Sequence, residues 1–455
     1  MHILMDIVMN NILVAPKIYM TKKYFNRRFC DLKKFLVTRL AGTTRLRTQP
    51  ICSSMLFTAS ITLLAGCGGG GATEKNPALA SAASGVVAHQ KAELSAVAKL
   101  GERIFNDASL SASGRVSCAS CHVASQAHAP DNALAMQPGG ADLHAAGTRT
   151  TPSLRYLRGN PVFSFDKNGA PSGGFMRDGR AASLAEQAAL PFLGAREMAN
   201  ASKADVVGRL RQATYADLFR ATFGTTIFDR VDEAFNRTMF ALQRFQQEAP
   251  EFALFNAKYD QFLAGKAALN PAELRGLALF NDRSKGNCIA CHPSGKNTNG
   301  SPPLFTDFSY DNLGVPRNPL IAENADQTYF DLGLCGPNRT DLAVRSELCG
   351  KFKVPTLRNV ATRRVFFHNG RFTTLRDVLG FYVRRDTNPE EWYPRAADGS
   401  INKFDDLPPQ YMGNVNRTEV PYNRQPGMQP ALSAAEIDDV IAFLGTLTDS
   451  AVAPD

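Results

Sequence analysis

The sequence predicts a mainly α-helical protein in which one module is used twice, with long irregular loops between the helices. Three observations lead to this fold class. The pentapeptide C-x-x-C-H occurs at Cys118–His122 and again at Cys288–His292. Each copy follows a stretch of helical periodicity that ends in the same Phe-Asn-Asp turn. No segment shows the alternation of a sheet-rich chain, so we expect few strands.

The first segment, residues 1–66, is predicted to be a leader. The chain has a net charge of +9, but residues 1–66 carry ten Lys and Arg against two acids. Because the remainder is nearly neutral, the charge does not indicate a nucleic-acid partner or an anionic membrane. The apolar run Met55–Leu64 is too short to span a bilayer stably and is typical of an export signal.

The leader ends in Leu64-Ala-Gly-Cys67, which resembles a bacterial lipobox. Cleavage there would leave Cys67 as a lipidated N-terminus, and an ordinary secretory signal cut near the same place is the alternative. The Gly- and Ala-rich residues 67–88 are expected to be a flexible tether. The predicted location is therefore the bacterial periplasm, with a lipid anchor in the outer membrane.

Two domains are expected to follow, at residues 89–250 and 251–455. In each, a helix precedes the pentapeptide, at residues 100–107 and 275–282, and Pro271 suits the start of the second one. A closing helix is predicted at 231–247 and at 433–446, where Ser433 and Glu436 form a capping box. The loops at 124–182 and 293–360 are long enough to suggest a functional role.

The pentapeptide is the attachment site of a covalent c-type haem. Cys118 and Cys121 would hold one haem through thioether bonds, Cys288 and Cys291 a second one, and the following histidine would ligate the iron. The alternatives are a thiol redox pair or half of a zinc site, neither of which requires a histidine in both copies. Cys335 and Cys349 remain and would form a disulfide in an oxidising compartment.

The chain from about residue 90 to 448 resembles the bacterial di-haem cytochrome c peroxidases and the related MauG-like enzymes. The resemblance rests on five stretches that occur in the family's order: Arg149–Leu154, Asp178–Gln187, Arg196–Met198, Val354–Asn359 and Phe367–Gly370. It implies two cytochrome c-like domains, each with one covalent haem. It also implies a haem oxidoreductase that reacts with hydrogen peroxide.

The resemblance places the peroxidatic haem on His122, with Glu197 as its acid–base group and Gln187 as a distal glutamine. A carboxylate there can move a proton between the two peroxide oxygens. Without the resemblance, we would interpret Glu197 as a solvated acidic residue of a loop. Gln187 could equally be an ordinary helix-surface glutamine.

The second haem, on His292, is expected to transfer electrons. The family has its sixth ligand fourteen residues after the histidine of the Phe-His-Asn-Gly segment, which is Tyr382 here. A tyrosine at this place is typical of MauG-like enzymes, and a phenolate favours oxidised iron. The alternative is core packing, because Leu375, Val378 and Leu379 fall on the same helical face.

Three positions depart from the family pattern. Arg177 stands where a relay tryptophan is usual between the haems, and Trp392 lies elsewhere in the chain. Thr150 replaces an asparagine that helps to build an inter-haem calcium site, so a calcium ion is only an open possibility. His144 lies near the place of a removable distal ligand of the first iron, or is an exposed loop residue. His89 and His128 are interpreted as surface residues.

The leading prediction is a dihaem peroxidase-like or MauG-like oxidoreductase. Electrons would pass through the C-terminal haem from a small redox protein or from a protein substrate that is oxidised. The alternatives are a non-catalytic electron-transfer cytochrome, which His144 as a true iron ligand would favour, and a peroxide sensor without turnover.

Overall fold

The computed structural model describes residues 93–450. The predicted leader, the tether, Cys67 and His89 lie outside the described residues. Within the described part, no helix has the length and apolar character needed to cross a membrane.

Helices dominate the regular structure, as predicted, and strands are short. The helices of the first half are α1 (Ala96–Asn106), α2 (Cys118–Cys121), α3 (Leu184–Leu193), α4 (Lys203–Gln212), α5 (Ala216–Phe223) and α6 (Val231–Glu248). Those of the second half are α7 (Lys258–Leu263), α8 (Pro271–Asn281), α9 (Leu375–Arg384) and α10 (Ala434–Gly445).

The three sheets that the structure describes are antiparallel pairs of two-residue strands. They are β1 (Pro138–Gly139) with β2 (Ala145–Ala146), β3 (Ser164–Phe165) with β4 (Pro171–Ser172), and β5 (Tyr310–Asp311) with β6 (Phe352–Lys353). Most of the remaining described chain is loop and short 3-10 turns. The predicted long loops are therefore confirmed.

The predicted helix starts are confirmed by their caps. The side chain of Asn270 accepts a hydrogen bond from the amide of Glu273 (2.9 Å), and Pro271 occupies the first position of α8. Ser433 and Glu436 form the predicted capping box of α10. Each cap satisfies amides that have no partner inside the helix, which fixes where the helix begins.

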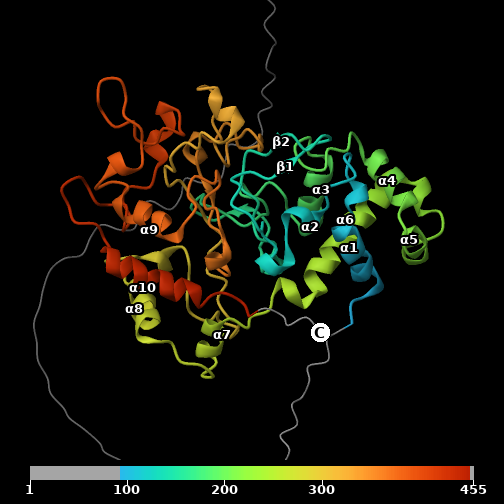
Figure 1. Ribbon diagram of the computed structural model, residues 1–455, viewed down its shortest axis with the longest axis horizontal. Helices are drawn as coiled ribbons and strands as arrows, with labels where there is room; N and C mark the ends of the chain where they lie inside the picture. Colours follow the sequence, from blue (N-terminus) through green and yellow to red (C-terminus); the bar gives the residue numbers. More distant parts are fainter. Residues whose placement is uncertain (1–92, 451–455) are drawn as a thin grey trace, which may run out of the picture. The chain divides into compact units, whose positions relative to one another are not determined.

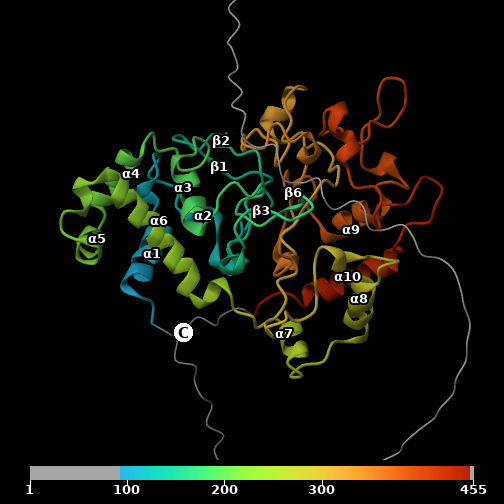
Figure 2. The ribbon, with the colours of Figure 1, turned by 180° about the vertical axis from the view of Figure 1, so that it is seen from behind.

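In both halves the helix before the pentapeptide packs on the closing helix: α1 on α6 and α8 on α10 (Figures 1 and 2). A glycine lies at each crossing. A Cβ atom on Gly101 would lie 2.0 Å from the carbonyl oxygen of Ala241, and one on Gly276 would lie 1.9 Å from that of Asp439. Only glycine therefore permits this close approach of two helix backbones.

Each helix pair belongs to its own apolar core. The first core runs from Leu100 to Phe252 in sequence and the second from Tyr259 to Leu447. Corresponding phenylalanines meet at the crossings, with Phe105 on Phe245 at 5.6 Å and Phe280 on Phe443 at 5.2 Å between ring centroids. The domain boundary at residue 250 stays a prediction, because the described residues belong to one compact unit.

The duplication also extends into the loops. Thr151–Arg155 and Val354–Arg358 are equivalent segments, and the hydroxyl in each donates to a backbone carbonyl. Ser153 donates to Ala127 (2.5 Å) and Thr356 to Leu304 (2.6 Å). A second pair, Phe175–Leu184 and Phe366–Leu375, turns through left-handed residues at Met176 and Phe367 and leads into α3 and α9.

These duplicated loops bond to each other across the two halves. The amide of Thr150 donates to the carbonyl of His368 (2.8 Å), and the amide of Lys353 donates to that of Arg177 (2.9 Å). Because the two bonds are reciprocal, each half helps to hold the other half's loop in place.

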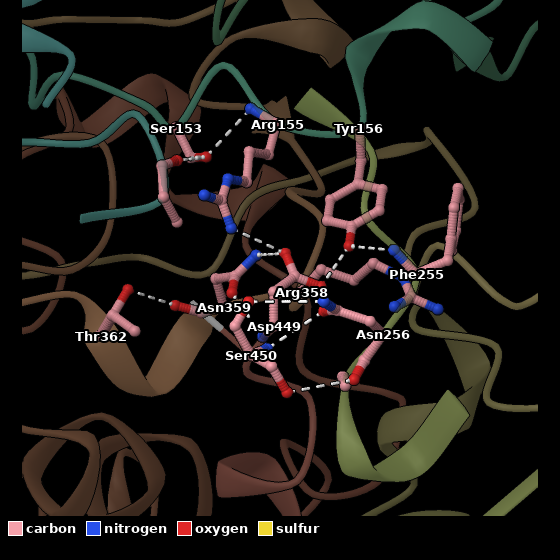
Figure 3. A network of polar contacts seen from close by, with 12 residues as sticks. Ser153, Arg155, Tyr156, Phe255, Asn256, Arg358, Asn359, Thr362, Asp449 and Ser450 are labelled. Atoms are coloured by element: carbon pink, nitrogen blue, oxygen red, sulfur yellow. Dashed lines mark hydrogen bonds and ion pairs between the residues drawn. The ribbon is translucent and has the colours of Figure 1, made fainter. Parts of the chain in front are cut away.

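A buried polar network around Asp449 joins the halves again (Figure 3). The Asp449 carboxylate accepts hydrogen bonds from Arg155 (2.9 Å), from Asn359 (2.7 Å) and from the Tyr156 hydroxyl. Arg358 lies over the ring of Tyr156 and pairs with buried Asp260 (2.8 Å). Asp449 therefore ties the loop of the first half to the C-terminal end of the second.

Candidate functional site

The first pentapeptide forms α2, which places Cys118, Cys121 and His122 on one turn. The His122 amide donates to the Cys118 carbonyl (2.9 Å), and the two cysteines form no disulfide. The Nδ1 atom of His122 lies 3.0 Å from the carbonyl oxygen of His128. Because a carbonyl only accepts, Nδ1 carries the proton and Nε2 is left to ligate an iron.

The second pentapeptide repeats this arrangement around a 3-10 turn, η6 (Cys288–Ala290). The His292 amide donates to Cys288 (2.8 Å), and Nδ1 of His292 donates to the carbonyl of Phe305 (2.7 Å). Burial lowers the pKa of His122 to about 4 and also lowers the pKa of His292. Both rings are therefore neutral at pH 7, as an iron ligand must be.

The two alternative interpretations of the cysteine pairs do not fit. Burial raises the pKa of Cys118 to about 12 and that of Cys121 to about 11, whereas a redox-active thiol needs a lowered pKa. Among residues 93–450, no three His, Cys, Asp or Glu side chains lie together as metal ligands, and a structural zinc ion needs four.

A cavity of about 320 Å³ lies beside the second pentapeptide, lined by Cys288, Cys291, His292 and Tyr382. Leu375, Val378 and Leu379 line it too, so the apolar face of α9 points to this cavity. The two thiols, the oriented imidazole and this cavity fit a covalently bound haem.

Tyr382 lies between two aromatic rings on the cavity wall. Its ring centroid is 5.8 Å from that of Phe367 and 5.8 Å from that of Tyr422. Burial raises the pKa of its phenol above the ordinary value, and the nearby Cys291 and Cys288 side chains act in the same direction. An iron ligand role therefore requires the metal itself to stabilise the phenolate.

Glu197 belongs to a tight turn after α3 in which successive amides point back to the helix end. The amide of Glu197 donates to Gly194 (2.9 Å) and that of Met198 to Pro191 (3.1 Å), while Gly140 donates to the Glu197 carbonyl (2.9 Å). The carboxylate lies close enough to Cys118 and Cys121 to raise the pKa of both thiols. Met198, the next residue, belongs to the apolar core against which Cys118 packs, so the turn that carries Glu197 lies near the first pentapeptide.

The Glu197 side chain is exposed by surface area, yet enough protein surrounds it for desolvation to raise its pKa. The positive charge of Arg180 opposes this shift. A carboxyl group with a raised pKa can both accept and donate a proton closer to neutral pH.

The other two residues expected near the first iron differ in their placement. Gln187 is partly buried on α3 and lines the cavity beside the second pentapeptide, which first-half residues such as Ala127 and Pro152 also line. His144 is exposed beside β2, and its backbone amide donates to Asp142 (3.0 Å).

The interpretation of His128 as a surface residue is wrong. Its side chain is 2 % exposed, and its ring stacks on Phe252 with 4.1 Å between centroids. Its backbone is left-handed (φ 53°), which directs its carbonyl to His122. Sequence periodicity gives no sign of this, because His128 lies in an irregular loop and is buried by residues distant in sequence.

The residues around Thr150 do not fit a calcium ion. The Thr150 hydroxyl donates to the Phe367 carbonyl (2.8 Å) and contacts the Arg177 guanidinium, whose Nε donates to the Thr150 carbonyl (3.1 Å). The oxygens that a calcium ion would need are thus occupied by a cationic side chain.

Trp392 packs on Phe372 and Phe381 in the second core, 5.8 Å from each ring centroid.

Several cavity residues were not predicted from the sequence. Lys353, Arg363, Asp311 and Tyr422 all line the cavity. An alignment of the chain with itself would have pointed to the Lys353 region, because Val354–Arg358 repeats Thr151–Arg155. Asp311 and Tyr422 carry no comparable pattern.

The expected disulfide is present, since Cys335 is bonded to Cys349.

The fold and the paired histidine sites define a class. Residues 95–268 match the family model described as di-haem cytochrome c peroxidase. The MauG methylamine utilization protein of Paracoccus denitrificans is 34% identical over 369 residues, which cover 79% of this chain and 90% of that protein. The chain therefore belongs to the di-haem cytochrome c peroxidase and MauG family, and it is a haem oxidoreductase.

Individual relatives come from both branches of the family. The cytochrome c551 peroxidase of Nitrosomonas europaea is 31% identical over 298 residues, covering 65% of this chain and 75% of the relative. Among solved structures, the diheme peroxidase BthA from Burkholderia thailandensis E264 is 40% identical, with a TM-score of 0.72, 78% of this chain covered and 86% of that one.

Proposed function

We propose that this protein reduces hydrogen peroxide at a haem held by Cys118, Cys121 and His122. The proximity of the Glu197 carboxylate to the first pentapeptide is the observation that carries this proposal. A second haem, held by Cys288, Cys291 and His292, with Tyr382 as its distal ligand, would pass electrons to the first. Family membership supports the presence of two haems.

A bound haem supplies an iron that takes up peroxide and exchanges electrons with it. Glu197 accepts a proton from one peroxide oxygen and returns it to the other, which leaves as water. Gln187 would orient the peroxide by a hydrogen bond. Overall, hydrogen peroxide takes up two electrons and two protons and yields two water molecules.

The electrons would come from a small redox protein or from a protein side chain that is oxidised. The likeness to a cytochrome c551 peroxidase supports a redox protein as the source, and the likeness to a MauG protein supports an oxidised side chain. We place the reaction in the periplasm, with Cys67 as a lipid anchor, since c-type haem attachment and the Cys335–Cys349 disulfide suit an oxidising compartment. His144 is exposed, so the structure offers no support for the electron-transfer alternative in which it caps the first iron.

Replacing Glu197 by Gln tests the proton-transfer role. We expect peroxide turnover to fall by about 100-fold or more while both haems stay attached. The parent rate should also fall as the pH drops through the raised pKa of Glu197, because the protonated acid cannot accept a proton. Peroxide consumption and covalent haem absorbance are the measurements.

Glu102→Gln is the matched control, since Glu102 is exposed on α1. It should keep the parent rate. Full turnover in Glu197→Gln would remove Glu197 from the mechanism.

A further inference from the structure

Three cationic side chains line the cavity without an acidic partner. They are Arg177, Lys353 and Arg363. None of them forms an ion pair with any residue between 93 and 450, although the same region holds many Arg–Asp pairs. Arg149, for example, pairs with both Asp178 and Asp331.

The hydrogen bonds of these three side chains go to neutral oxygens. The Nε atom of Arg177 donates to the Thr150 carbonyl (3.1 Å), Arg363 to the Thr151 carbonyl (2.9 Å) and Lys353 to the Gly174 carbonyl (2.5 Å). These bonds fix the direction of each side chain but leave its positive charge uncompensated.

Such an arrangement is costly in a protein that has nothing bound. Burial lowers the pKa of Lys353 to about 7 and that of Arg363 to about 10. The pKa of Arg177 falls to about 9 through burial and through the charges of Arg363 and Arg149, partly offset by Asp331. Charges shielded from water are normally paired, so three partly buried, unpaired cations that line one cavity point to an anion, although Asp311 and Glu419 also line it.

The position of the cations identifies this anion. The same cavity is lined by Cys288, Cys291 and His292, which would anchor the second haem. A haem carries two carboxylate groups at one edge, and a guanidinium can bind a carboxylate through two parallel hydrogen bonds. A phosphate or chloride ion from solution would meet the same charges, so the two sources of the anion have to be separated by experiment.

We infer that Arg177, Lys353 and Arg363 form a receptor for the carboxylates of the haem on His292, and that this receptor replaces a divalent cation between the two halves. The inference rests on the proposed function, because it requires the second haem. It assigns to Arg177 a positioning role in place of the aromatic relay that its position would otherwise suggest.

The reduction potential of the second haem tests the receptor. Oxidised haem carries one more positive charge than reduced haem, so a nearby cation favours the reduced form. Arg177→Gln and Lys353→Met should each lower the potential of that haem. We expect about a tenfold change in the reduction equilibrium, which is about 59 mV for one electron.

Two further variants separate charge from structure. Arg177→Lys keeps the charge and should keep a potential near that of the parent. Arg364→Gln removes an exposed neighbouring charge and should leave both potentials unchanged. Spectroelectrochemical titration gives the potentials. Added inorganic phosphate should have no effect, and a phosphate-dependent potential would assign the receptor to a dissolved anion instead.

A third variant, Arg363→Gln, completes the set. The inference would be overturned if Arg177→Gln, Lys353→Met and Arg363→Gln all kept the potential measured for Arg364→Gln. An equal loss of haem from Arg177→Gln and Arg177→Lys would overturn it too, since the charge would then not be what matters. If peroxide turnover persists in these cases, the proposed function stands. A parent protein without covalent haem would instead overturn both.

Discussion

Each pentapeptide histidine is oriented by one backbone carbonyl. His122 donates to His128 and His292 donates to Phe305, and both acceptor residues have left-handed backbones. When the Nδ1 proton of an imidazole is held in this way, Nε2 points in a defined direction. It also becomes a stronger electron-pair donor to a metal. The side chain that distinguishes the second site is Tyr382, because its phenol faces the cavity that His292 also lines.

Replacing Tyr382 by Phe should change the absorbance spectrum of the second haem and leave that of the first haem unchanged. The reason is that only the second iron would lose an anionic oxygen ligand. Optical and electron paramagnetic resonance spectra of the ferric protein make the measurement. Tyr411→Phe, at a tyrosine that packs against a different cluster, is the control. Identical spectra for the parent and Tyr382→Phe would return Tyr382 to a packing role.

At the scale of the elements, two helix crossings position the pentapeptides. In each crossing a glycine permits backbone contact, and a Phe-Asn-Asp turn follows, a short distance before the cysteines of the pentapeptide. The Asp107 and Asp282 side chains hold these turns by accepting hydrogen bonds from the amides of Ser109 (2.9 Å) and Ser284 (2.8 Å). The site therefore depends on how closely α1 approaches α6 and how closely α8 approaches α10.

Gly101→Ala should destabilise the protein by about 1–3 kcal/mol, because the new methyl group would collide with the backbone of α6. Gly208→Ala in α4 is the matched control, since nothing lies within 4 Å of its added Cβ. Alanine is the better helix former, so this control should gain about 0.5–1 kcal/mol. Urea unfolding gives both free energies. A stabilising Gly101→Ala would show that the crossing tolerates a wider separation.

At the scale of the whole molecule, the two halves are joined by reciprocal bonds between their loops and by the Asp449 network. Both connections lie close to the first pentapeptide, since Leu154, which stands between Thr150 and Arg155, donates its amide to the His128 carbonyl (3.1 Å). A shift of one half against the other would therefore disturb the orientation of His122 in the first half. The contact between the halves is part of the site as well as of the fold.

Asp449→Asn should lower the free energy of unfolding by about 3–5 kcal/mol, because it leaves the buried Arg155 guanidinium without its countercharge. Asp438→Asn is the comparison, since Asp438 forms an exposed pair with Arg376 that contributes at most about 1 kcal/mol. Chemical unfolding of both variants decides between them. Equal losses would mean that the Asp449 network is not what holds the halves together.

The sequence by itself determined the features that are local in the chain. The C-x-x-C-H spacing predicts a haem-binding turn, and the periodicity and caps predict α1, α6, α8 and α10. These signals are readable because all their atoms come from residues within a few positions of one another. Glu197 and Tyr382 became candidates only through the family resemblance, since their neighbours in sequence give no sign of a metal.

Only the tertiary structure decided what lies around these turns. The burial of His128, the reciprocal bonds of Thr150 and Lys353, and the unpaired cations Arg177 and Arg363 all arise where irregular loops from the two halves meet. No periodic pattern marks such positions, because their environment comes from residues as far as 217 positions away in sequence. The sequence thus determined the pentapeptides that we propose to bind the haems, and the packing of the duplicated halves decided their electrostatic surroundings.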